Sequence, residues 1–246
     1  ANTVFAGDAG INGKARFYKT TDAGLSWIVL DSIEGPTASF NGVKFSESMP
    51  LFGIAVSGNI NGCESPNFIY KTKDGGNSWT KKELPGFPGA ATSINSLNVI
   101  DSLFYSFGTT MCLPSIIITT NGGLTWNLRN IGLPSLNENI TNGIAFNSNK
   151  LTGIAESSSL PLITRTTNGG LTWTDLYLGL DISGKCTMRW IEGTDICYLS
   201  STHAPSGAIL KSTNGGLNWI QMTTGNSGIS IFDVKKNGHG IFGYAV

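Results

Sequence analysis

The sequence predicts an all-β protein, a β-propeller built from four-stranded antiparallel blades. No stretch has the periodicity of a helix, and an eight-residue motif with the consensus Ser/Thr-x-Asp/Asn-x-Gly-x-x-Trp recurs along the chain. The tryptophans of its five copies are 52, 47, 47 and 46 residues apart. A period of about 40–50 residues between strand-like segments is typical of propellers. The five copies begin at Thr20, Thr72, Thr119, Thr166 and Ser212.

Each copy of the motif predicts a tight turn between two strands. In the second copy, the alternating run 68–72 is a strand, and the Asp74 carboxylate is expected to accept hydrogen bonds from backbone N–H groups of the turn. Gly76 supplies a positive φ. Trp79 begins the returning strand and packs between two sheets, where its burial is worth roughly 4–6 kcal/mol before ordering entropy. The same roles fall to Asp22 and Trp27, Asn121 and Trp126, Asn168 and Trp173, and Asn214 and Trp219.

Four complete blades follow from the strand patterns, with strands named a to d from the propeller axis outward. Strand a is expected at 42–46, 95–99, 142–146 and 187–191. Strand b is expected at 52–57, 103–107, 152–156 and 196–200. Strand c is expected at 67–72, 115–120, 162–166 and 208–212. Strand d begins at Trp79, Trp126, Trp173 and Trp219.

The two ends of the chain carry incomplete blades. The N-terminal part offers strands at 3–7, 15–20 and 27–30, and the tail offers strands a and b at 230–234 and 241–246. Joining the tail to 15–20 and 27–30 would close a ring of five blades, with 3–7 as a spare strand. The alternative is part of a six- to eight-bladed ring. Residues 1–246 are expected to form a single domain.

Charge and hydropathy exclude two classes of partner. Sixteen basic and sixteen acidic residues cancel, and no run of Lys or Arg exists, so we expect no nucleic-acid partner. No apolar run approaches the roughly 20 residues of a membrane span, so we expect no membrane insertion. Charged residues make up 13%, against about 25% on average, so hydroxyl and amide groups cover the surface.

None of the four cysteines has zinc-type spacing, and together with the Ser/Thr/Asn-rich surface they favour an oxidising compartment over the cytosol. Cys63 and Cys112 occupy equivalent b–c loops of neighbouring blades, and we predict a disulfide between them. Cys186 and Cys197 lie on paired strands and could form a second disulfide, although a turn at 192–195 would leave Cys186 one diagonal too far. Free thiols are the alternative. The expected location is extracellular, at the cell surface or periplasmic.

The motif resembles the Asp box, or BNR repeat, of sialidases, sortilin-type receptors and the photosystem II assembly and stability factors. The longer unit, with Val43-Lys44-Phe45, residues 52–56, Tyr70-Lys71-Thr72 and the box, is most similar to the last of these families. The resemblance covers nearly the whole chain. It implies that the boxes are structural turns away from the ligand face, and that the chain is a scaffold or assembly factor.

No catalytic residues are predicted. A sialidase needs three arginines around a carboxylate, but Arg16 and Arg165 lie on strand c, away from the axis, and the Arg-Ile/Val-Pro motif is absent. Other glycosidases need two carboxylates across a cleft. A calcium site from Asp8, Asn12, Asn59 and Asn61 is conceivable, but such residues are ordinary in turns. We therefore expect no metal and no cofactor.

The face that carries the b–c and d–a loops is the expected recognition surface. Phe87 lies there on the stiff loop Pro85-Gly-Phe-Pro88. The hypothesis is a non-catalytic, secreted or cell-surface scaffold that binds a protein. The alternative is a glycan-binding, lectin-like propeller or a glycoside hydrolase. The candidate binding residues are Asp8, Asn59, Glu64, Phe87, Glu156 and His203.

One position on strand a tests ring closure. It holds Lys44, Asn98, Ala145, Arg189 and, in the tail, Asp233, and most of these are expected at one level of the ring. A closed five-bladed ring would place Asp233 between Arg189 and Lys44, where one acid would balance two bases.

Overall fold

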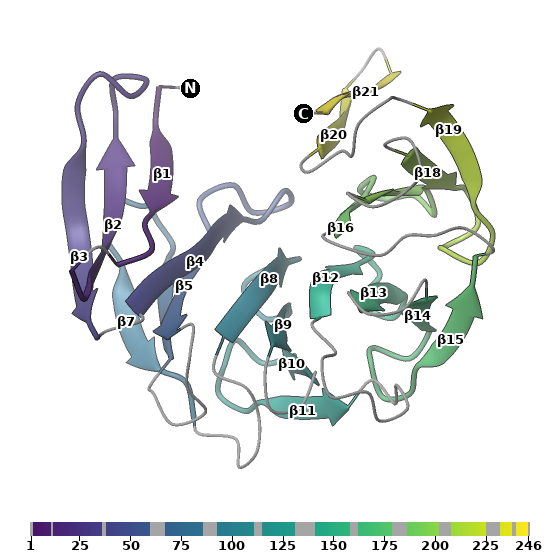
Figure 1. The fold of residues 1–246 in the computed structure, drawn as a ribbon, viewed down its shortest axis with the longest axis horizontal. Helices are drawn as coiled ribbons and strands as arrows, with labels where there is room; N and C mark the ends of the chain where they lie inside the picture. Colours follow the sequence, from purple (N-terminus) through teal and green to yellow (C-terminus); the bar gives the residue numbers. More distant parts are fainter. Residues whose placement is uncertain are drawn as a thin grey trace.

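The computed structural model describes residues 2–10, 12–35, 38–59, 67–85, 93–110, 115–130, 141–157, 162–178, 186–201, 208–224, 232–237 and 240–245. These residues form 21 β-strands, and none of them is helical. The strands make six antiparallel sheets that follow one another along an arc (Figure 1). The predicted all-β propeller fold is confirmed.

Four sheets have four strands each, and their strands lie within a few residues of the predicted positions. Sheet 2 contains β4 (Ala38–Phe45), β5 (Gly53–Asn59), β6 (Phe68–Thr72) and β7 (Thr80–Glu83). Sheet 3 contains β8 (Ser93–Val99), β9 (Tyr105–Thr110), β10 (Ser115–Thr119) and β11 (Asn127–Asn130). Sheet 4 contains β12 (Thr141–Phe146), β13 (Gly153–Ser157), β14 (Leu162–Thr166) and β15 (Thr174–Tyr177). Sheet 5 contains β16 (Cys186–Trp190), β17 (Cys197–Ser201), β18 (Ala208–Ser212) and β19 (Ile220–Thr224).

The end sheets differ from the predicted closure. Sheet 1 contains β1 (Val4–Gly7), β2 (Lys14–Thr20) and β3 (Ile28–Glu34), and the tail sheet contains β20 (Phe232–Asn237) and β21 (Gly240–Ala245). The strand expected as a spare is a full member of sheet 1, because β1 pairs with β2 from Val4↔Thr20 to Gly7↔Phe17. It therefore occupies the place that β21 would have needed. Among the described residues, no hydrogen bond joins sheet 1 to the tail sheet, and the two lie at the ends of the arc (Figure 1).

A long inner strand ties sheet 1 to sheet 2. The first residues of β4 pair with β5 on one side and with residues 8–10 on the other, where Gly10 N–H donates to Ala38 O at 2.7 Å and Phe40 N–H donates to Asp8 O at 3.0 Å. Phe40 also stacks on Phe17 with ring centroids 5.4 Å apart. β4 therefore partly replaces the inner strand that sheet 1 lacks.

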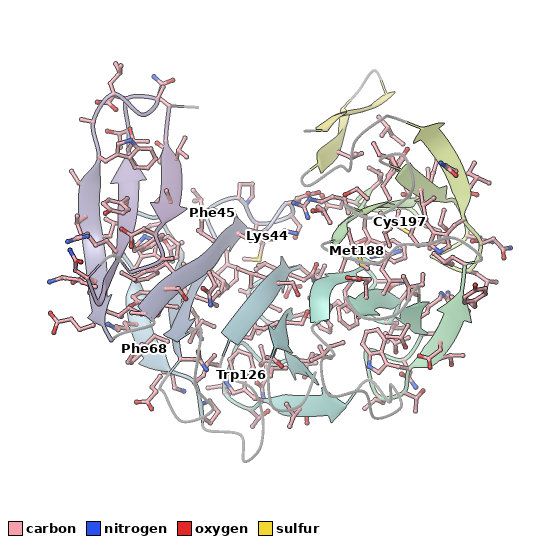
Figure 2. The ribbon with its side chains drawn as sticks, in the orientation of Figure 1. Lys44, Phe45, Phe68, Trp126, Met188 and Cys197 are labelled. Carbon is pink, nitrogen blue, oxygen red and sulfur yellow. The ribbon has the colours of Figure 1, made fainter. Side chains whose placement is uncertain are left out.

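Each junction between neighbouring sheets has its own hydrophobic core. Phe17 and Tyr70 belong to the core between sheets 1 and 2, and Ile54 and Phe107 to the one between sheets 2 and 3. Ile118 and Phe146 meet between sheets 3 and 4. Figure 2 labels Met188 and Cys197, which lie in the core that sheets 4 and 5 share. The protein is held together by contacts between neighbours along the arc.

The Asp boxes form the predicted turns in all five copies. In the second copy, Asp74 Oδ1 accepts hydrogen bonds from the N–H groups of Asn77 at 3.0 Å and Ser78 at 2.9 Å. Gly76 has a φ of +82° and donates its N–H to Thr72 Oγ1 at 2.8 Å. The corresponding bond to the Asp or Asn side chain comes from the backbone N–H of Ser26, Thr125, Thr172 and Asn218.

Four of the five box tryptophans are partly buried between sheets, as predicted. Trp79 packs edge-on against Phe5 and Phe17 of sheet 1, at centroid distances of 5.6 and 5.1 Å. Trp126, Trp173 and Trp219 pack against the cores formed with the preceding sheet. The prediction is wrong for Trp27, which is 43% exposed, because no other sheet of the described residues packs on its side of sheet 1.

A basic side chain adds a polar contact at three junctions. It stands immediately before the Ser/Thr of the box and donates to a carbonyl of the next sheet's box. Lys19 Nζ donates to Gly76 O at 3.0 Å, Lys71 Nζ to Gly122 O at 2.5 Å, and Arg165 Nε to Gly215 O at 2.6 Å. This contact was not predicted from the sequence, although the three residues share one position relative to the box.

We predict that the two aspartate boxes make the fold acid-sensitive, whereas the three asparagine boxes do not. Hydrogen bonds lower the pKa of Asp22 to about 2, and the largest contribution comes from the side chain of Ser26. The side chain of Ser78 lowers the pKa of Asp74 in the same way. A group whose pKa is lowered in the folded state stabilises the fold at pH values above its ordinary pKa, which is 3.8 for aspartate. That stabilisation is lost as the pH falls through the folded-state pKa.

The test is urea unfolding of Asp74→Asn at pH values from 6 down to 2. We expect the free energy of unfolding to fall less between about pH 4 and pH 2 than in the wild type. The reverse change, Asn121→Asp, should make the fall steeper. Equal pH slopes in all three proteins would contradict this account.

Candidate functional site

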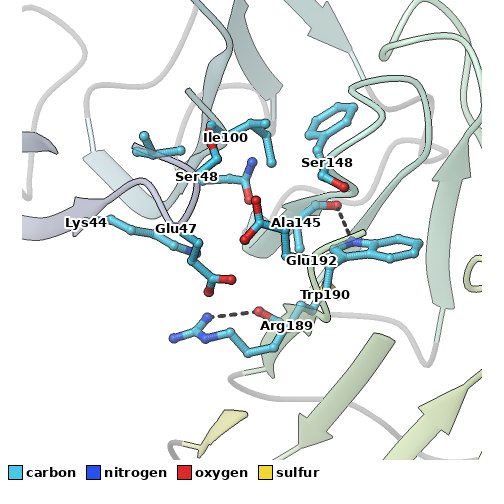
Figure 3. Close-up of a pocket in the computed structure, with 13 residues that line it drawn as sticks. Lys44, Glu47, Ser48, Ile100, Ala145, Ser148, Arg189, Trp190 and Glu192 are labelled. Carbon is cyan, nitrogen blue, oxygen red and sulfur yellow. Dashed lines mark hydrogen bonds between the residues drawn. The ribbon is translucent and has the colours of Figure 1, made fainter. Parts of the chain in front are cut away.

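Four successive inner strands bring their side chains to one pocket near the axis of the arc (Figure 3). Lys44, Asn98, Ala145 and Arg189, from β4, β8, β12 and β16, all line it, which confirms that these four share one level. The empty space in and above the pocket amounts to about 490 Å³, and this includes open solvent at its mouth. Asp233 lies on β20, but its side chain is outside the described residues. Its place between Arg189 and Lys44 stays a prediction.

The rim of the pocket is built from the turns that follow these strands, and it is tied together from sheet to sheet. Ser46 Oγ donates to Ile100 O at 2.5 Å, so the turn of sheet 2 is bound to sheet 3. An ion pair between Lys150 and Asp101 joins sheets 3 and 4. Sheets 4 and 5 are joined by Asn147 Nδ2, which donates to Thr194 O at 3.0 Å. The rim is therefore positioned before any ligand arrives.

The floor of the pocket is apolar. Phe146, Met188 and Trp190 are buried, and the Trp190 indole N–H donates to Ala145 O at 3.2 Å. The sequence analysis assigned Trp190 to the core between blades, which its 8% exposure confirms. The floor can accept an apolar group of a ligand. The Trp190 indole itself lies within the core between sheets 4 and 5.

The walls and mouth carry both signs of charge. Lys44 and Arg189 are half-buried, and Arg189 Nη1 donates to Met188 O at 2.9 Å. Glu47 and Glu192 stand exposed at the mouth (Figure 3). Asn98 is only 4% exposed, and its Nδ2 has no hydrogen-bond partner among the described residues. A buried amide donor without a partner is costly, so this group favours a ligand that brings an acceptor.

The pocket lies at the opposite end of the strands from the loops that the sequence analysis favoured. It is formed where strand a ends and the a–b turn begins, whereas the b–c and d–a loops lie at the other end. Glu47, Ser148 and Glu192 were missed. Each stands three residues after the shared position of its inner strand, so alignment of the repeats could have found them.

Three of the predicted binding residues have described positions. Asp8 is occupied within sheet 1, where it accepts hydrogen bonds from Arg16 N–H and Tyr18 Oη. Asn59 ends β5, with its backbone paired to Ala38. Glu156 is fully buried on β13 and does not face solvent. Neither Asp8 nor Glu156 lines the axial pocket, and the Asn59 side chain and all of Glu64, Phe87 and His203 lie outside the described residues.

The predicted disulfide between Cys186 and Cys197 is wrong, because Cys197 is a free thiol. The strand register pairs Cys186 with Ser201 and Cys197 with Trp190. Four residues along a strand span about 13 Å, well beyond the roughly 4.4–6.8 Å between Cα atoms that a disulfide allows. Cys63 and Cys112 lie outside the described residues, so their disulfide stays a prediction.

We predict that Cys197 is unreactive in the folded protein. Burial raises the pKa of its thiol to about 12, so almost no thiolate forms at neutral pH. Iodoacetamide labelling followed by mass spectrometry of the peptide that contains Cys197 should show slow modification in buffer and rapid modification in denaturant. Rapid labelling under native conditions would contradict the buried position.

No group of three or more His, Cys, Asp or Glu side chains among the described residues could hold a metal ion. Within the same part of the chain, no helix is long and apolar enough to cross a membrane.

Fold and pocket together define a β-propeller protein of Asp-box blades with a pre-formed cleft near its axis. The chain belongs to the family described as photosynthesis system II assembly factor YCF48, which matches residues 105–243. No curated protein sequence matches the chain.

Solved structures with the same fold come from proteins of different function. The major Malassezia sympodialis allergen Mala s 1 is 12% identical, with a TM-score of 0.64 over 100% of this chain and 83% of its own. YCF48 from Cyanidioschyzon merolae is 17% identical, with a TM-score of 0.53 over 94% and 72%. The Niastella koreensis GH74 enzyme is 16% identical, with a TM-score of 0.59 over 89% of this chain. This chain spans only 38% of the length of that enzyme. At these identities the likeness shows the fold alone.

Proposed function

We propose that this protein is a non-catalytic scaffold that binds a protein partner through the axial pocket. Membership of an assembly-factor family supports a protein-binding role. The observation that carries the proposal is the buried amide of Asn98, which lines the pocket and has no hydrogen-bond partner among the described residues.

A polypeptide segment has the chemistry that this pocket lacks. Every peptide unit offers a carbonyl acceptor for Asn98 Nδ2, and an apolar side chain can cover the floor at Met188 and Trp190. Charged groups of the partner meet both signs at the mouth, with Lys44 on one side and Glu192 on the other. Because the pocket carries both signs of charge, the charges of the partner should affect its orientation in the pocket more strongly than its total affinity.

The test begins with selection of binders from a displayed peptide library, followed by affinity measurements on pocket variants. Asn98→Leu removes the amide and keeps the volume, so we expect the fold to be as stable as the wild type or more stable. Affinity should fall by about 2–10-fold, which corresponds to one hydrogen bond. Glu192→Lys should change the affinity for charged peptides.

The matched control for the charge reversal is Glu83→Lys, on the exposed strand β7 and outside the pocket. It should bind as the wild type does. Peptides that bind every variant equally would place the site elsewhere and contradict the proposal.

The alternative is a carbohydrate-active propeller, and the two carboxylates at the mouth favour it. Glycoside hydrolysis uses two carboxyl groups that face each other across the scissile bond. Glu47 and Glu192 both line the pocket, and GH74 enzymes share the fold. A glycan array and a panel of oligosaccharides separate the proposals. Sugar release that both Glu47→Gln and Glu192→Gln abolish would establish the alternative, and we expect none.

We also propose an extracellular, cell-surface or periplasmic location, which the low content of charged residues supports. Fractionation of cells that express the natural gene product tests this. Recovery in the cytosolic fraction would overturn it.

A further inference from the structure

The face around the mouth of the axial pocket is built from two kinds of turn, the a–b turn and the Asp box of each four-stranded sheet. On sheet 3, Gly122 N–H of the box donates to Leu103 O of the a–b turn at 2.9 Å. Gly169 N–H and Leu151 O form the same bond on sheet 4, also at 2.9 Å. Each of these turns presents a leucine to solvent. The exposed fractions are 53% for Leu103, 80% for Leu124, 56% for Leu151 and 62% for Leu171. We call these four side chains the leucine patch.

Neither kind of turn requires a leucine. The a–b turn of sheet 3 is held by Asp101 Oδ1, which accepts a hydrogen bond from Leu103 N–H at 2.9 Å, so the leucine side chain takes no part in the turn. The other sheets accept polar residues at the equivalent positions, since Asn77 stands in the box of sheet 2 and Asp195 in the a–b turn of sheet 5, and both are exposed. Exposed apolar side chains that gather on neighbouring sheets without a structural role mark a contact surface.

The leucine patch continues the wall of the axial pocket outward. Ile100 and Ser148 line the pocket (Figure 3), and each stands three residues before a leucine of the patch, Leu103 or Leu151. Three residues span at most about 10 Å. A polypeptide segment that is bound in the pocket would therefore need only about three to six further residues to cross the patch.

The charges around the leucine patch favour an uncharged occupant. Lys150, next to Leu151 in the sequence, forms an ion pair with Asp101 of the neighbouring turn, so these two charges cancel. The boxes of sheets 3 and 4 carry the neutral Asn121 and Asn168, whereas the boxes of sheets 1 and 2 carry aspartate. A phosphate-rich surface such as an anionic membrane is attracted by clusters of basic side chains, which these turns do not supply.

We propose that the partner segment held in the axial pocket continues over sheets 3 and 4 as an apolar, uncharged stretch whose side chains cover the leucine patch. This inference rests on the proposed function, because it extends the segment that the pocket binds. The pocket orients the segment through the Asn98 amide and the charges at its mouth, and the patch adds apolar contact area. The class of partner is then a protein in which a polar motif adjoins an apolar stretch of about three to six residues.

The experiment uses the pocket-binding peptides from the displayed library in three forms: unextended, with a Leu/Val/Phe extension of about six residues, and with a Ser/Gly/Asn extension of the same length. Each extension is tested at either end of the peptide. The apolar extension at one end should raise the affinity of the wild type by about tenfold or more, and the polar one should not. A patch variant, with all four leucines replaced by Gln, should lose this gain but bind unextended peptides as the wild type does. The control is Leu25→Gln, at the same box position in sheet 1, where the leucine is 90% exposed. It should keep the gain.

The outcomes separate this inference from the proposed function. An apolar extension that brings the wild type no gain, or a gain that persists in the patch variant, would overturn the inference and leave pocket binding intact. Unextended peptides that bind Asn98→Leu as tightly as the wild type would overturn the proposed function and this extension of it together. Self-association, or binding to phosphatidylcholine vesicles, that the patch variant abolishes would show that a second copy or a bilayer covers the leucines instead.

Discussion

Replacing Trp79 by Ala should cost about 3–5 kcal/mol of unfolding free energy, the range typical of a large aromatic removed from a core. Its indole contacts Phe5, Phe17 and Phe45 edge-on, with centroids 5.6, 5.1 and 6.0 Å away. Each aromatic pair is worth about 0.5–1.5 kcal/mol beyond the area it buries. The loss should appear as a lower denaturant midpoint with an unchanged slope.

The matched control is Trp27→Ala, which alters the same box position in a sheet without a preceding neighbour. Trp27 has one edge-on contact, with Tyr18 at 6.5 Å, and is 43% exposed. We expect a loss of about 1 kcal/mol or less in the free energy of unfolding. Equal losses for the two variants would mean that the boxes are stabilised within their own blades.

A second large effect is expected from Gly76→Ala. The added Cβ would lie 2.1 Å from Phe5 Cζ, and the backbone has a φ of +82°. The left-handed backbone costs about 1–2 kcal/mol for a residue with a Cβ, and overpacking adds about 1–3 kcal/mol. We therefore expect a loss of about 2–5 kcal/mol in denaturant unfolding.

Gly24→Ala separates the two causes. Gly24 has a φ of +95°, but its Cβ would approach nothing closer than Trp27 at 3.9 Å. Only the backbone cost of about 1–2 kcal/mol should remain. In a Phe5→Ala background, Gly76→Ala should lose its extra cost, as a double-mutant cycle would show. If the cost persists in that background, steric conflict with Phe5 is not its cause.

The box motif allowed the sheets to be predicted because each copy combines local signals. Thr72, Asp74 and Gly76 form a turn through bonds among themselves, so the strands on either side follow from alternation. The end sheets could not be predicted in this way. Whether 3–7 pairs with 15–20 or is displaced by the tail depends on contacts between distant segments, which strand patterns do not encode.

The pocket, like the fold, could be predicted from the sequence only in part. The shared level of Lys44, Asn98, Ala145 and Arg189 followed from the repeat. The choice of face did not, because the sequence analysis favoured long loops, whereas the pocket is formed by short turns. That Asn98 Nδ2 is buried without a partner among the described residues depends on the exact approach of three other strands, so no single strand pattern could indicate it.

Each junction between neighbouring sheets has its own hydrophobic core, and this affects how cooperatively the protein unfolds. In such a linear array, stability is close to a sum of sheet terms and nearest-neighbour terms, so the array can fray from its ends. Sheet 1 and sheet 5 each have one four-stranded neighbour, whereas sheets 3 and 4 have two. Amide hydrogen exchange should therefore be slowest in β9 and β13 and fastest in the end sheets. The pocket is lined by sheets 2, 3, 4 and 5, so its middle wall belongs to the most persistent part of the molecule, while Arg189 and Trp190 stand on a sheet that exchanges more readily.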